Sequence, residues 1–324
     1  MCNFSSIKDK PIVVFGVGSI GERHISNLIK LGFNNIYAFR KRNLPLRNIN
    51  NNQIQVITTW DEVKQINPIA AFITTPTSLH IEQIIECVKL GINVFVEKPL
   101  SHTTDKIDEL LRLIEKHKVF IFVGYMMRFH PLIVRLKEFT ESGIYGELIS
   151  LQSKWGEYLP YWHPWEDYRT SYVARKELGG GVALTLSHDI DLANYLIDAK
   201  IEEYHVIRNT KSKLEVDVEA GFDLIMKYDN GTTANINLNF FEKQQDRFLR
   251  LVFDEASIIF DYYNATLSIN ELGKEQIVKL DEFDRNELFV EEIKYFFDKL
   301  TNHSTEEVIK QITESELIIK ICIQ

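Results

Sequence analysis

The first 123 residues alternate short apolar runs with amphipathic stretches. Most runs are apolar throughout, which is typical of strands buried on both faces of a parallel sheet. Gly32 and Gly91 are placed to end two of the intervening helices, and Ser78 and Thr103 or Thr104 to begin two of them. The predicted strands are 11–15, 36–39, 54–57, 70–74, 93–97 and 119–123, and the predicted helices are 19–32, 78–91 and 103–118. This βαβ series predicts an α/β domain with a doubly wound parallel sheet of Rossmann type.

The pattern changes after about residue 124. A helix is expected around 131–142, and the aromatic stretch 154–172 looks too irregular for a helix or a strand. A glycine-rich segment and a helix to about residue 197 come next. Residues 201–270 read mostly as strands, with a hairpin turn at YDNGT (228–232), and residues 286–324 read as two helices. We therefore expect a first domain of Rossmann type over 1–123 and a second α/β domain over 124–324, with a mainly antiparallel sheet.

Composition narrows the class of protein. A chain of 324 residues with 45% hydrophobic and 26% charged residues fits a globular protein of two domains. The net charge of −9 argues against a broad nucleic-acid surface. Cys2, Cys87 and Cys322 lie far apart without ligand spacing, which argues against zinc and a disulfide framework, and no metal is expected. No apolar run is long enough to span a membrane, so a cytoplasmic protein is expected.

The segment VVFGVGSIGERH joins the first predicted strand to the first helix. Gly16 permits the turn, Gly18 lets the backbone approach a pyrophosphate, and Gly21 lets helix and strand pack closely. The phosphates then lie at the helix N-terminus. The alternative is a plain structural turn. The predicted cofactor contacts of this segment are Gly16, Gly18, Ser19, Ile20 and Gly21.

The end of the second strand bears on the choice between NAD and NADP. An NAD site has an acid near this point that binds the ribose 2′-hydroxyl. This chain has Arg40, Lys41 and Arg42 there and no carboxylate. Cations favour a 2′-phosphate, so NADP is the predicted cofactor and NAD the alternative. The cations also fit a solvated basic loop, because arginine stacks on adenine without a phosphate.

Three further motifs combine with the glycine segment. Residues 73–101 contain Thr-Pro, a histidine and then Glu-Lys-Pro at 97–99; GYMMRFHP (124–131) follows, and GGG with SHDID comes later. Together these motifs resemble the Gfo/Idh/MocA family of NAD(P)-dependent oxidoreductases across nearly the whole chain. Glu-Lys-Pro at the end of a strand is the most specific of them.

This resemblance implies a Rossmann domain followed by an α/β domain with a large open sheet, commonly the interface of a homo-oligomer. It also implies hydride transfer between C4 of a nicotinamide and a hydroxyl-bearing carbon, usually on a sugar or cyclitol. Lys98 then lies beside the reacting oxygen, where an ammonium stabilises a developing alkoxide. Pro99 would hold the turn, with a cis peptide before it. The alternative for Glu97 and Lys98 is a surface ion pair at a strand end.

Residues after the fourth strand lie at the carboxyl edge of the sheet, where ligands bind in such folds. His80, near the start of a helix, either touches the cofactor or caps and packs that helix. The cofactor contacts expected at this edge are Thr74, Thr75, Pro76, His80, Glu97 and Lys98.

The second domain supplies the predicted substrate contacts. Tyr125 can donate to a sugar hydroxyl, and Arg128 can bind a carboxylate or phosphate bidentately; the resemblance favours the cleft for at least one of them. Trp155, Tyr168 and Arg169 belong to the aromatic stretch, whose rings suit sugar faces. Alternatively, the aromatic side chains pin this stretch to the core. Similar stretches occur in a family branch associated with bacterial surface-sugar biosynthesis, including sialic-like nine-carbon sugars.

The segment after the triple glycine departs from the family pattern. Most members have an Asp there and a His four residues later, whereas this chain has Thr185 and, three residues on, His188. His188 either still relays the substrate proton, oriented by Asp189 or Asp191, or is a structural residue that leaves Lys98 as the main proton donor. Asp191 either binds a substrate hydroxyl or caps the helix. Thr185 and Asp191 are included among the predicted substrate contacts.

The sequence thus predicts an NADP-preferring sugar dehydrogenase or reductase in which Lys98 stabilises the oxygen and His188 relays the proton. Its expected partners are a small sugar and further copies of itself, as a dimer or tetramer, without nucleic acid or membrane. One alternative is a family enzyme that uses NAD transiently in glycoside cleavage. Another is a dinucleotide-binding regulator or partner protein that lost catalysis when Thr185 replaced the acid.

Overall fold

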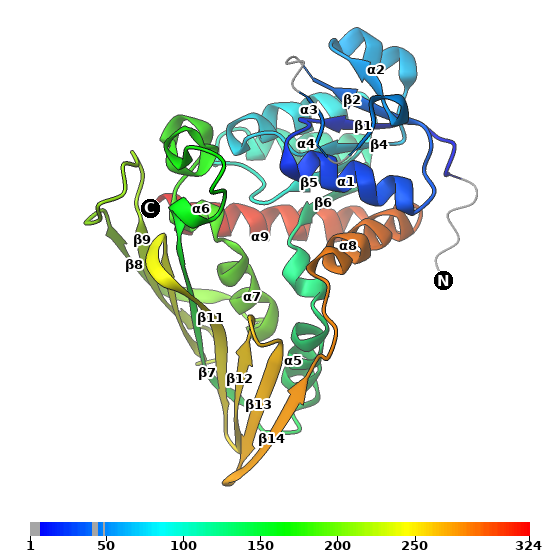
Figure 1. Ribbon diagram of the computed structural model, residues 1–324. Coiled ribbons are helices and arrows are strands. Elements are labelled where there is room, and N and C mark those ends of the chain that lie inside the picture. The colour runs from blue at the N-terminus through cyan, green and yellow to red at the C-terminus, as the bar shows by residue number, and fades with distance from the viewer. Residues whose placement is uncertain (1–6, 41–44, 48) are drawn as a thin grey trace. The chain divides into compact units, whose positions relative to one another are not determined.

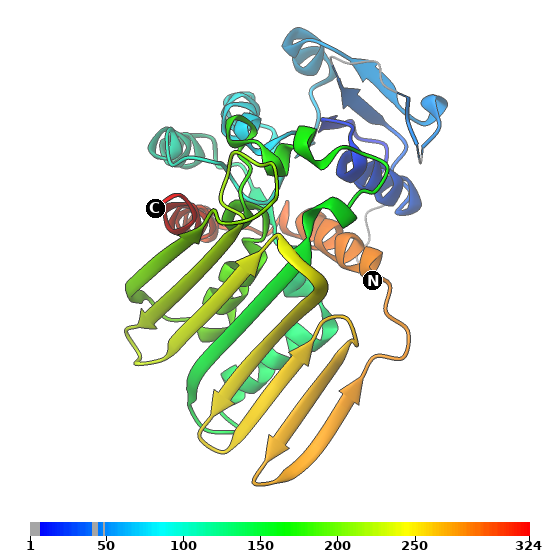
Figure 2. The same cartoon turned by 60° about the vertical axis from the view of Figure 1, so that its left-hand side comes forward.

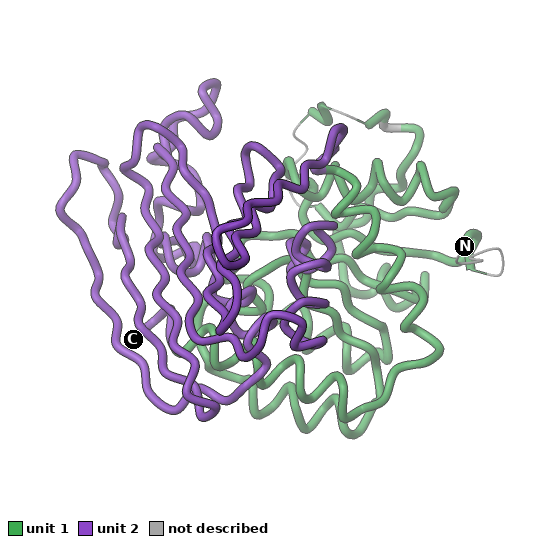
Figure 3. Tube along the Cα trace, turned by 90° about the horizontal axis from the view of Figure 1, so that it is seen from below, with its two compact units in different colours: residues 1–124, 286–320 green, residues 125–285, 321–324 purple. Residues whose placement is uncertain are grey.

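The chain divides into two compact units, coloured green and purple in Figure 3. The computed structural model describes residues 7–40, 45–47 and 49–324. Unit 1 comprises residues 1–124 and 286–320, and unit 2 comprises 125–285 and 321–324. The sequence prediction assigned everything after residue 123 to the second domain. The two C-terminal helices exist as predicted, but most of their length belongs to unit 1, because a helical pattern does not reveal which sheet the helix will cover.

Unit 1 is built on a six-stranded parallel sheet in the order β3-β2-β1-β4-β5-β6. The strand order reverses between β1 and β4, which is the Rossmann arrangement that the βαβ pattern predicted. The strands are β1 (Ile12–Phe15), β2 (Ile36–Phe39), β3 (Gln55–Ile57), β4 (Ala70–Ile73), β5 (Asn93–Glu97) and β6 (Ile121–Gly124). Each lies within two residues of its predicted range.

The helices of unit 1 end as the glycine pattern predicted but begin elsewhere. Gly32 and Gly91 follow the last turns with φ of 92° and 71°. The starts expected at Ser78 and at Thr103 or Thr104 were wrong: a 3-10 turn takes up Thr77–Leu79, and Lys106 precedes α4 in a left-handed conformation. The helices are α1 (Ser19–Lys30), α2 (Trp60–Ile66), α3 (His80–Lys89), α4 (Ile107–His117), α8 (Arg285–Lys299) and α9 (Thr305–Ile323).

An aromatic cluster explains why α8 belongs to unit 1. Phe72 of β4 and Phe95 of β5 stack with ring centroids 4.8 Å apart, and Phe296 of α8 meets both rings edge-on. Phe297 of α8 stacks on Phe33, which follows α1, at 4.4 Å. Burying such side chains stabilises the fold by about 1.5–3 kcal/mol each. This cluster anchors α8 to the face of the sheet that α1 also covers (Figure 1).

Unit 2 contains an eight-stranded sheet in the order β14-β13-β12-β11-β7-β10-β9-β8 (Figure 2). Its pairs are antiparallel except for β7 with β10, which confirms the predicted mainly antiparallel sheet. The hairpin expected at YDNGT joins β9 to β10. The strands are β7 (Leu148–Tyr158), β8 (Ile201–Asn209), β9 (Gly221–Tyr228), β10 (Thr233–Asn239), β11 (Phe241–Phe253), β12 (Ala256–Asp261), β13 (Thr266–Glu271) and β14 (Lys274–Lys279).

One prediction for unit 2 was wrong. The aromatic stretch was expected to be irregular from residue 154, yet its first five residues are the end of β7. Leu151, Ser153 and Trp155 are buried at alternate positions, so the period of a half-buried strand continues into the aromatic residues. The strand β14 was not predicted at all, because its side chains are mostly exposed.

The helices of unit 2 are α5 (Pro131–Ser142), α6 (Val182–Thr185) and α7 (His188–Ile197), and α5 and α7 match their predicted ranges. His130 caps α5, and Pro131 occupies its first turn. The helix α7 packs on β7 and β10, and α5 packs on α7. Among the described residues, no helix is long and apolar enough to cross a membrane.

Candidate active site

The glycine turn of unit 1 runs from the end of β1 into α1. Gly16 has φ of 81°, and a Cβ on Gly21 would lie 2.1 Å from the carbonyl oxygen of Gly16, so neither position accepts a side chain. A Cβ on Gly18 would meet nothing within 4 Å among the described residues. The turn is therefore closely packed against the protein and open on its outer side. This geometry fits a pyrophosphate, which approaches backbone N–H groups at a helix start.

Thr74 and His80 brace the carboxyl edge of the sheet beside this turn. Thr74 Oγ1 donates to carbonyl oxygens at the end of β1 and in the glycine turn, at 3.0 and 2.5 Å. The two ring nitrogens of His80 lie 2.9 Å from the carbonyl oxygens of Thr75 and Pro99. His80 is 1% exposed, and burial lowers its pKa. These contacts agree with the alternative in which His80 packs the start of its helix. They also join the Thr-Pro turn to the Glu-Lys-Pro turn.

Arg40 follows β2 at the same edge of the sheet. The N–H of Gly16 donates to the carbonyl oxygen of Phe39 at 3.2 Å, which fixes the glycine turn against the end of β2. Lys41 and Arg42, the other two cations expected at the ribose, lie outside the described residues. The structure therefore places Arg40 next to the turn that fits the dinucleotide.

Lys98 follows β5, is partly exposed, and is joined to Pro99 by a cis peptide, as the resemblance implied. Glu97, the last residue of β5, is 9% exposed. Its Oε1 accepts a hydrogen bond of 2.7 Å from Nε2 of His24 on α1. Glu97 therefore contacts the core of unit 1, and Lys98 is the more exposed of the two side chains.

Glu292 on α8 completes a buried cluster with Glu97 and His24. It is 0% exposed, and its carboxylate oxygens accept no hydrogen bond within the described parts of the chain. One ligand-type atom from each of the three side chains lies within 4.8 Å of the others. Two charged carboxylates at this distance repel each other by roughly 3 kcal/mol at an effective dielectric constant of about 20.

The two carboxyl groups of this cluster have opposite pKa shifts. Burial, and then the charge of Glu97, raise the pKa of Glu292 well above its ordinary value. Burial also acts to raise the pKa of Glu97. The hydrogen bond from His24 and nearby positive charge, including that of Lys98, outweigh burial and lower it.

In unit 2, the guanidinium of Arg128 binds the carboxylate of Asp191 bidentately. Its Nε and Nη2 donate to the two carboxylate oxygens at 2.9 and 2.6 Å, and Asp191 is 1% exposed. The guanidinium also lies over the ring of Tyr195. Tyr125 is 4% exposed and meets the ring of His188 edge-on, with centroids 5.6 Å apart. These five side chains thus tie the residues after β6 to α7.

Asp189 holds the start of α7 from the other side. Its carboxylate accepts hydrogen bonds from Ser153 Oγ at 2.6 Å and from Arg247 Nη2 at 2.7 Å. Arg247 is 3% exposed, and its guanidinium carbon lies 3.6 Å from the ring centroid of Trp155. The same tryptophan ring lies 6.2 Å from that of His188. The first residue of α7 is therefore held in place by a buried ion pair and two aromatic rings.

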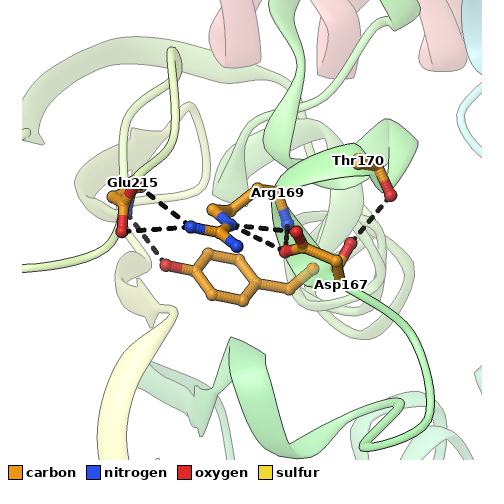
Figure 4. A network of polar contacts seen from close by, with 5 residues as sticks. Asp167, Arg169, Thr170 and Glu215 are labelled. Atoms are coloured by element: carbon orange, nitrogen blue, oxygen red, sulfur yellow. Dashed lines mark hydrogen bonds and ion pairs between the residues drawn. The ribbon is translucent and has the colours of Figure 1, made fainter.

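The remaining predicted substrate residues differ in their surroundings. Thr185 ends α6 and is 5% exposed, close in sequence to His188. Arg169 lies in an exposed loop, where its guanidinium bridges Asp167 at 2.8 Å and Glu215 at 3.4 Å (Figure 4). The hydroxyl of Tyr168 accepts the N–H of Glu215 at 3.1 Å. Arg169 and Tyr168 thus cross-link two loops of unit 2.

Several residues of these clusters were not predicted from the sequence, among them His24, Ser153, Arg247 and Glu292. Two signals were available. Arg247 shares the inward phase of β11 with apolar positions, so a charge there needs a buried partner. Glu292 lies on the buried face of α8 with Phe289 and Phe296, where an acid is equally out of place.

The fold and the glycine turn together define the class of dinucleotide-binding proteins with a Rossmann domain. Comparison with protein-family models agrees. The model of the oxidoreductase family with an NAD-binding Rossmann fold matches residues 10–125, and the GFO/IDH/MocA C-terminal domain matches residues 133–259. The chain belongs to the Gfo/Idh/MocA family of NAD(P)-dependent oxidoreductases, whose members act on sugars.

Three known proteins illustrate the likeness. The myo-inositol 2-dehydrogenase of Thermotoga maritima is 29% identical, over 59% of this chain and 56% of its own length. The 2,7-anhydro-N-acetylneuraminate hydratase of Mediterraneibacter gnavus is 28% identical, over 41% of this chain and 34% of its own. The solved UDP-N-acetylglucosamine 3-dehydrogenase of Acidithiobacillus ferrooxidans has a TM-score of 0.76 and 19% identity, over 98% of this chain and 96% of its own. This chain spans about half the length of the curated relatives it matches first.

Proposed function

We propose that this protein is a sugar dehydrogenase or reductase that moves a hydride between a nicotinamide cofactor, preferably NADP, and a hydroxyl or keto carbon. The observation that carries the proposal is the position of Lys98. It follows β5 at the same sheet edge as the glycine turn after β1, in a sheet whose order reverses between β1 and β4. Ligands of such folds bind at that edge. When bound, the nicotinamide supplies or accepts the hydride.

The protein's own groups handle the oxygen and its proton in this proposal. Lys98 donates to the substrate oxygen and stabilises negative charge as it develops there. His188 relays the proton, since imidazole titrates near neutral pH. The buried pair of Asp189 and Arg247 supports this role by fixing the turn of α7 that carries His188.

Arg40 supports the preference for NADP, because a cation beside the end of β2 suits a 2′-phosphate. Replacing Arg40 with serine should weaken NADP binding about tenfold or more and leave NAD binding nearly unchanged. Lys64→Ser on α2 is the matched control, an exposed cation of the same unit. A tenfold preference of the wild-type protein for NAD would contradict this part of the proposal.

The names of the relatives support a sugar or cyclitol substrate, in keeping with a place in surface-polysaccharide or sialic-like sugar biosynthesis. The test is a screen of sugars, cyclitols and nucleotide sugars for oxidation or reduction of NADP and NAD in parallel. Turnover of any of these with a change in nicotinamide absorbance supports the proposal. Tight cofactor binding without turnover of any of them would favour a regulatory protein.

A second candidate follows from the relative named a hydratase. Hydration of a sugar has no net redox change, so a family enzyme of this kind would use its nicotinamide only transiently. Cofactor that survives purification, product formation and an unchanged cofactor redox state would favour this candidate. The residues proposed to act, Lys98 and His188, are the same in both.

We propose further that the sheet of unit 2 forms the interface of a homo-oligomer. Ile207 of β8 and Ile225 of β9 are 67% and 54% exposed, and their strand register places them on one face. Replacing both with serine should shift the protein toward the monomer in sedimentation. An unchanged sedimentation coefficient would contradict the assignment of this face.

A further inference from the structure

The buried cluster of His24, Glu97 and Glu292 holds two carboxyl groups in unit 1, next to the residue proposed to act on the substrate oxygen. The three side chains come from α1, β5 and α8 and meet among the rings of Phe95 and Phe289. Both acids are at least nine-tenths buried. Such a site has room for one negative charge that is well hydrogen-bonded, and not for two.

The two acids differ in the hydrogen bonds that they accept. Glu97 accepts a hydrogen bond from His24, whereas both oxygens of Glu292 lack any donor in the described part of the chain. An ionised carboxylate needs donors, while a neutral carboxyl group is itself a donor. A Glu97 oxygen lies within 4.8 Å and is the acceptor at hand. Gly124, opposite Glu97 on β6, leaves the space into which Glu292 points, since a Cβ there would be 3.4 Å from its Oε2.

We propose that Glu292 is a neutral acid that donates its proton toward Glu97, and that it acts as a positioning residue which keeps one negative charge behind Lys98. Glu97 then accepts from His24 on one side and from Glu292 on the other. Its charge favours the ammonium form of Lys98. A second charge at Glu292 would strengthen that preference and hinder release of the lysine proton. The role of Lys98 in this inference rests on the proposed function.

The ionisable groups that face the pair come from three elements besides α8. His24 lies on α1, Lys98 follows β5, and His80 on α3 also acts on Glu97 electrostatically. Arg23, on α1 as well, lies over the ring of Phe289. Burial and the charge of Glu97 raise the pKa of Glu292, in agreement with a proton retained at neutral pH.

Infrared spectroscopy of the full-length protein in D2O tests the proton directly. Above neutral pH the exposed acids are ionised, so a carbonyl band of a protonated carboxyl group reports a buried one. We expect such a band in the wild-type protein, its disappearance on raising the pH further, and its loss in Glu292→Gln. A wild-type protein without the band would overturn the proposal, and so would a stoichiometric divalent cation that Glu292→Gln releases. Because the first measurement uses the wild-type protein, it does not depend on the folding of any variant.

The pH dependence of the rate tests the positioning role. Glu97→Gln removes the charge and should move the limb of the profile that belongs to Lys98 to lower pH by roughly one unit. Glu292→Gln removes no charge, so that limb should stay in place while the rate falls several-fold with the weaker donor. An equal shift in both variants would overturn the proposal. If Lys98→Met leaves turnover intact while the infrared band persists, the proposed function fails and the neutral acid stands.

Discussion

Arg247 forms a buried ion pair with Asp189, the residue that directly follows the histidine proposed to relay the substrate proton. The 2.7 Å hydrogen bond joins side chains that are 3% and 1% exposed. Removing one partner of such a pair leaves an uncompensated charge in the core. We predict that Arg247→Met and Asp189→Asn each lower the free energy of unfolding by about 3–5 kcal/mol, because each leaves the other side chain of the pair buried without its counter-charge.

Chemical denaturation of both single variants and the double variant measures this coupling. Lys227→Met serves as control, because that lysine pairs with Glu202 on the surface and should contribute little. Additive losses from Arg247→Met and Asp189→Asn would contradict an energetic link between the two side chains.

The glycine turn allows a matched pair of variants. Gly21→Ala places a Cβ 2.1 Å from the carbonyl oxygen of Gly16, so it should lower the melting temperature and abolish cofactor binding. A Cβ in Gly18→Ala meets no atom of the described residues within 4 Å, so this variant should melt like the wild type, yet bind NADP at least tenfold more weakly, because the Cβ occupies the pyrophosphate's approach. Calorimetry and fluorescence titration separate the two effects. Wild-type NADP affinity in Gly18→Ala would exclude the turn as the phosphate site.

His130 should make the protein less stable in mild acid. Burial, and then the charge of Arg247, lower its pKa from 6.5 to about 4, while its Nδ1 accepts the N–H of Leu132. Between these values the unfolded chain binds more protons than the folded one, so this contribution is complete above pH 6.5 and is lost as the pH falls toward 4. The loss reaches about 3 kcal/mol at most.

His130→Asn keeps a capping side chain without this titration, so its stability should change less between those two pH values. His205→Asn, at an exposed histidine, should follow the wild-type curve. Parallel curves for wild type and His130→Asn, measured by denaturation across this range, would show that the histidine does not titrate in this way.

The sequence predicted the Rossmann sheet well because five of its six strands are largely buried on both faces and leave short apolar runs, whereas only the edge strand β3 is mostly exposed. It also predicted the glycine turn from a local motif, while the cis peptide before Pro99 was implied by the family resemblance. The aromatic end of β7 was missed because bulky residues and a glycine obscured the alternation of Ser153 and Trp155. The membership of α8 in unit 1 was missed because it depends on contacts such as Phe296 with Phe72, more than 200 residues apart.

The clusters around the candidate site depend on long-range pairing as well. Glu97 was expected to contact the cofactor at the edge of the sheet, but its hydrogen-bond partner His24 lies 73 residues away. Arg128 was expected to bind a carboxylate or phosphate of the substrate, whereas in the structure it binds the carboxylate of Asp191 in its own unit. Local sequence shows which side chains need partners, and only the fold shows which partners they have.

Single-turnover hydride transfer in Lys98→Met tests the central claim most directly, with the sugar found in the screen and NADPH bound before mixing. If Lys98 stabilises the reacting oxygen, NADPH affinity should stay within about twofold of wild type while the transfer rate falls by roughly 100-fold or more. A wild-type transfer rate in this variant would contradict the account.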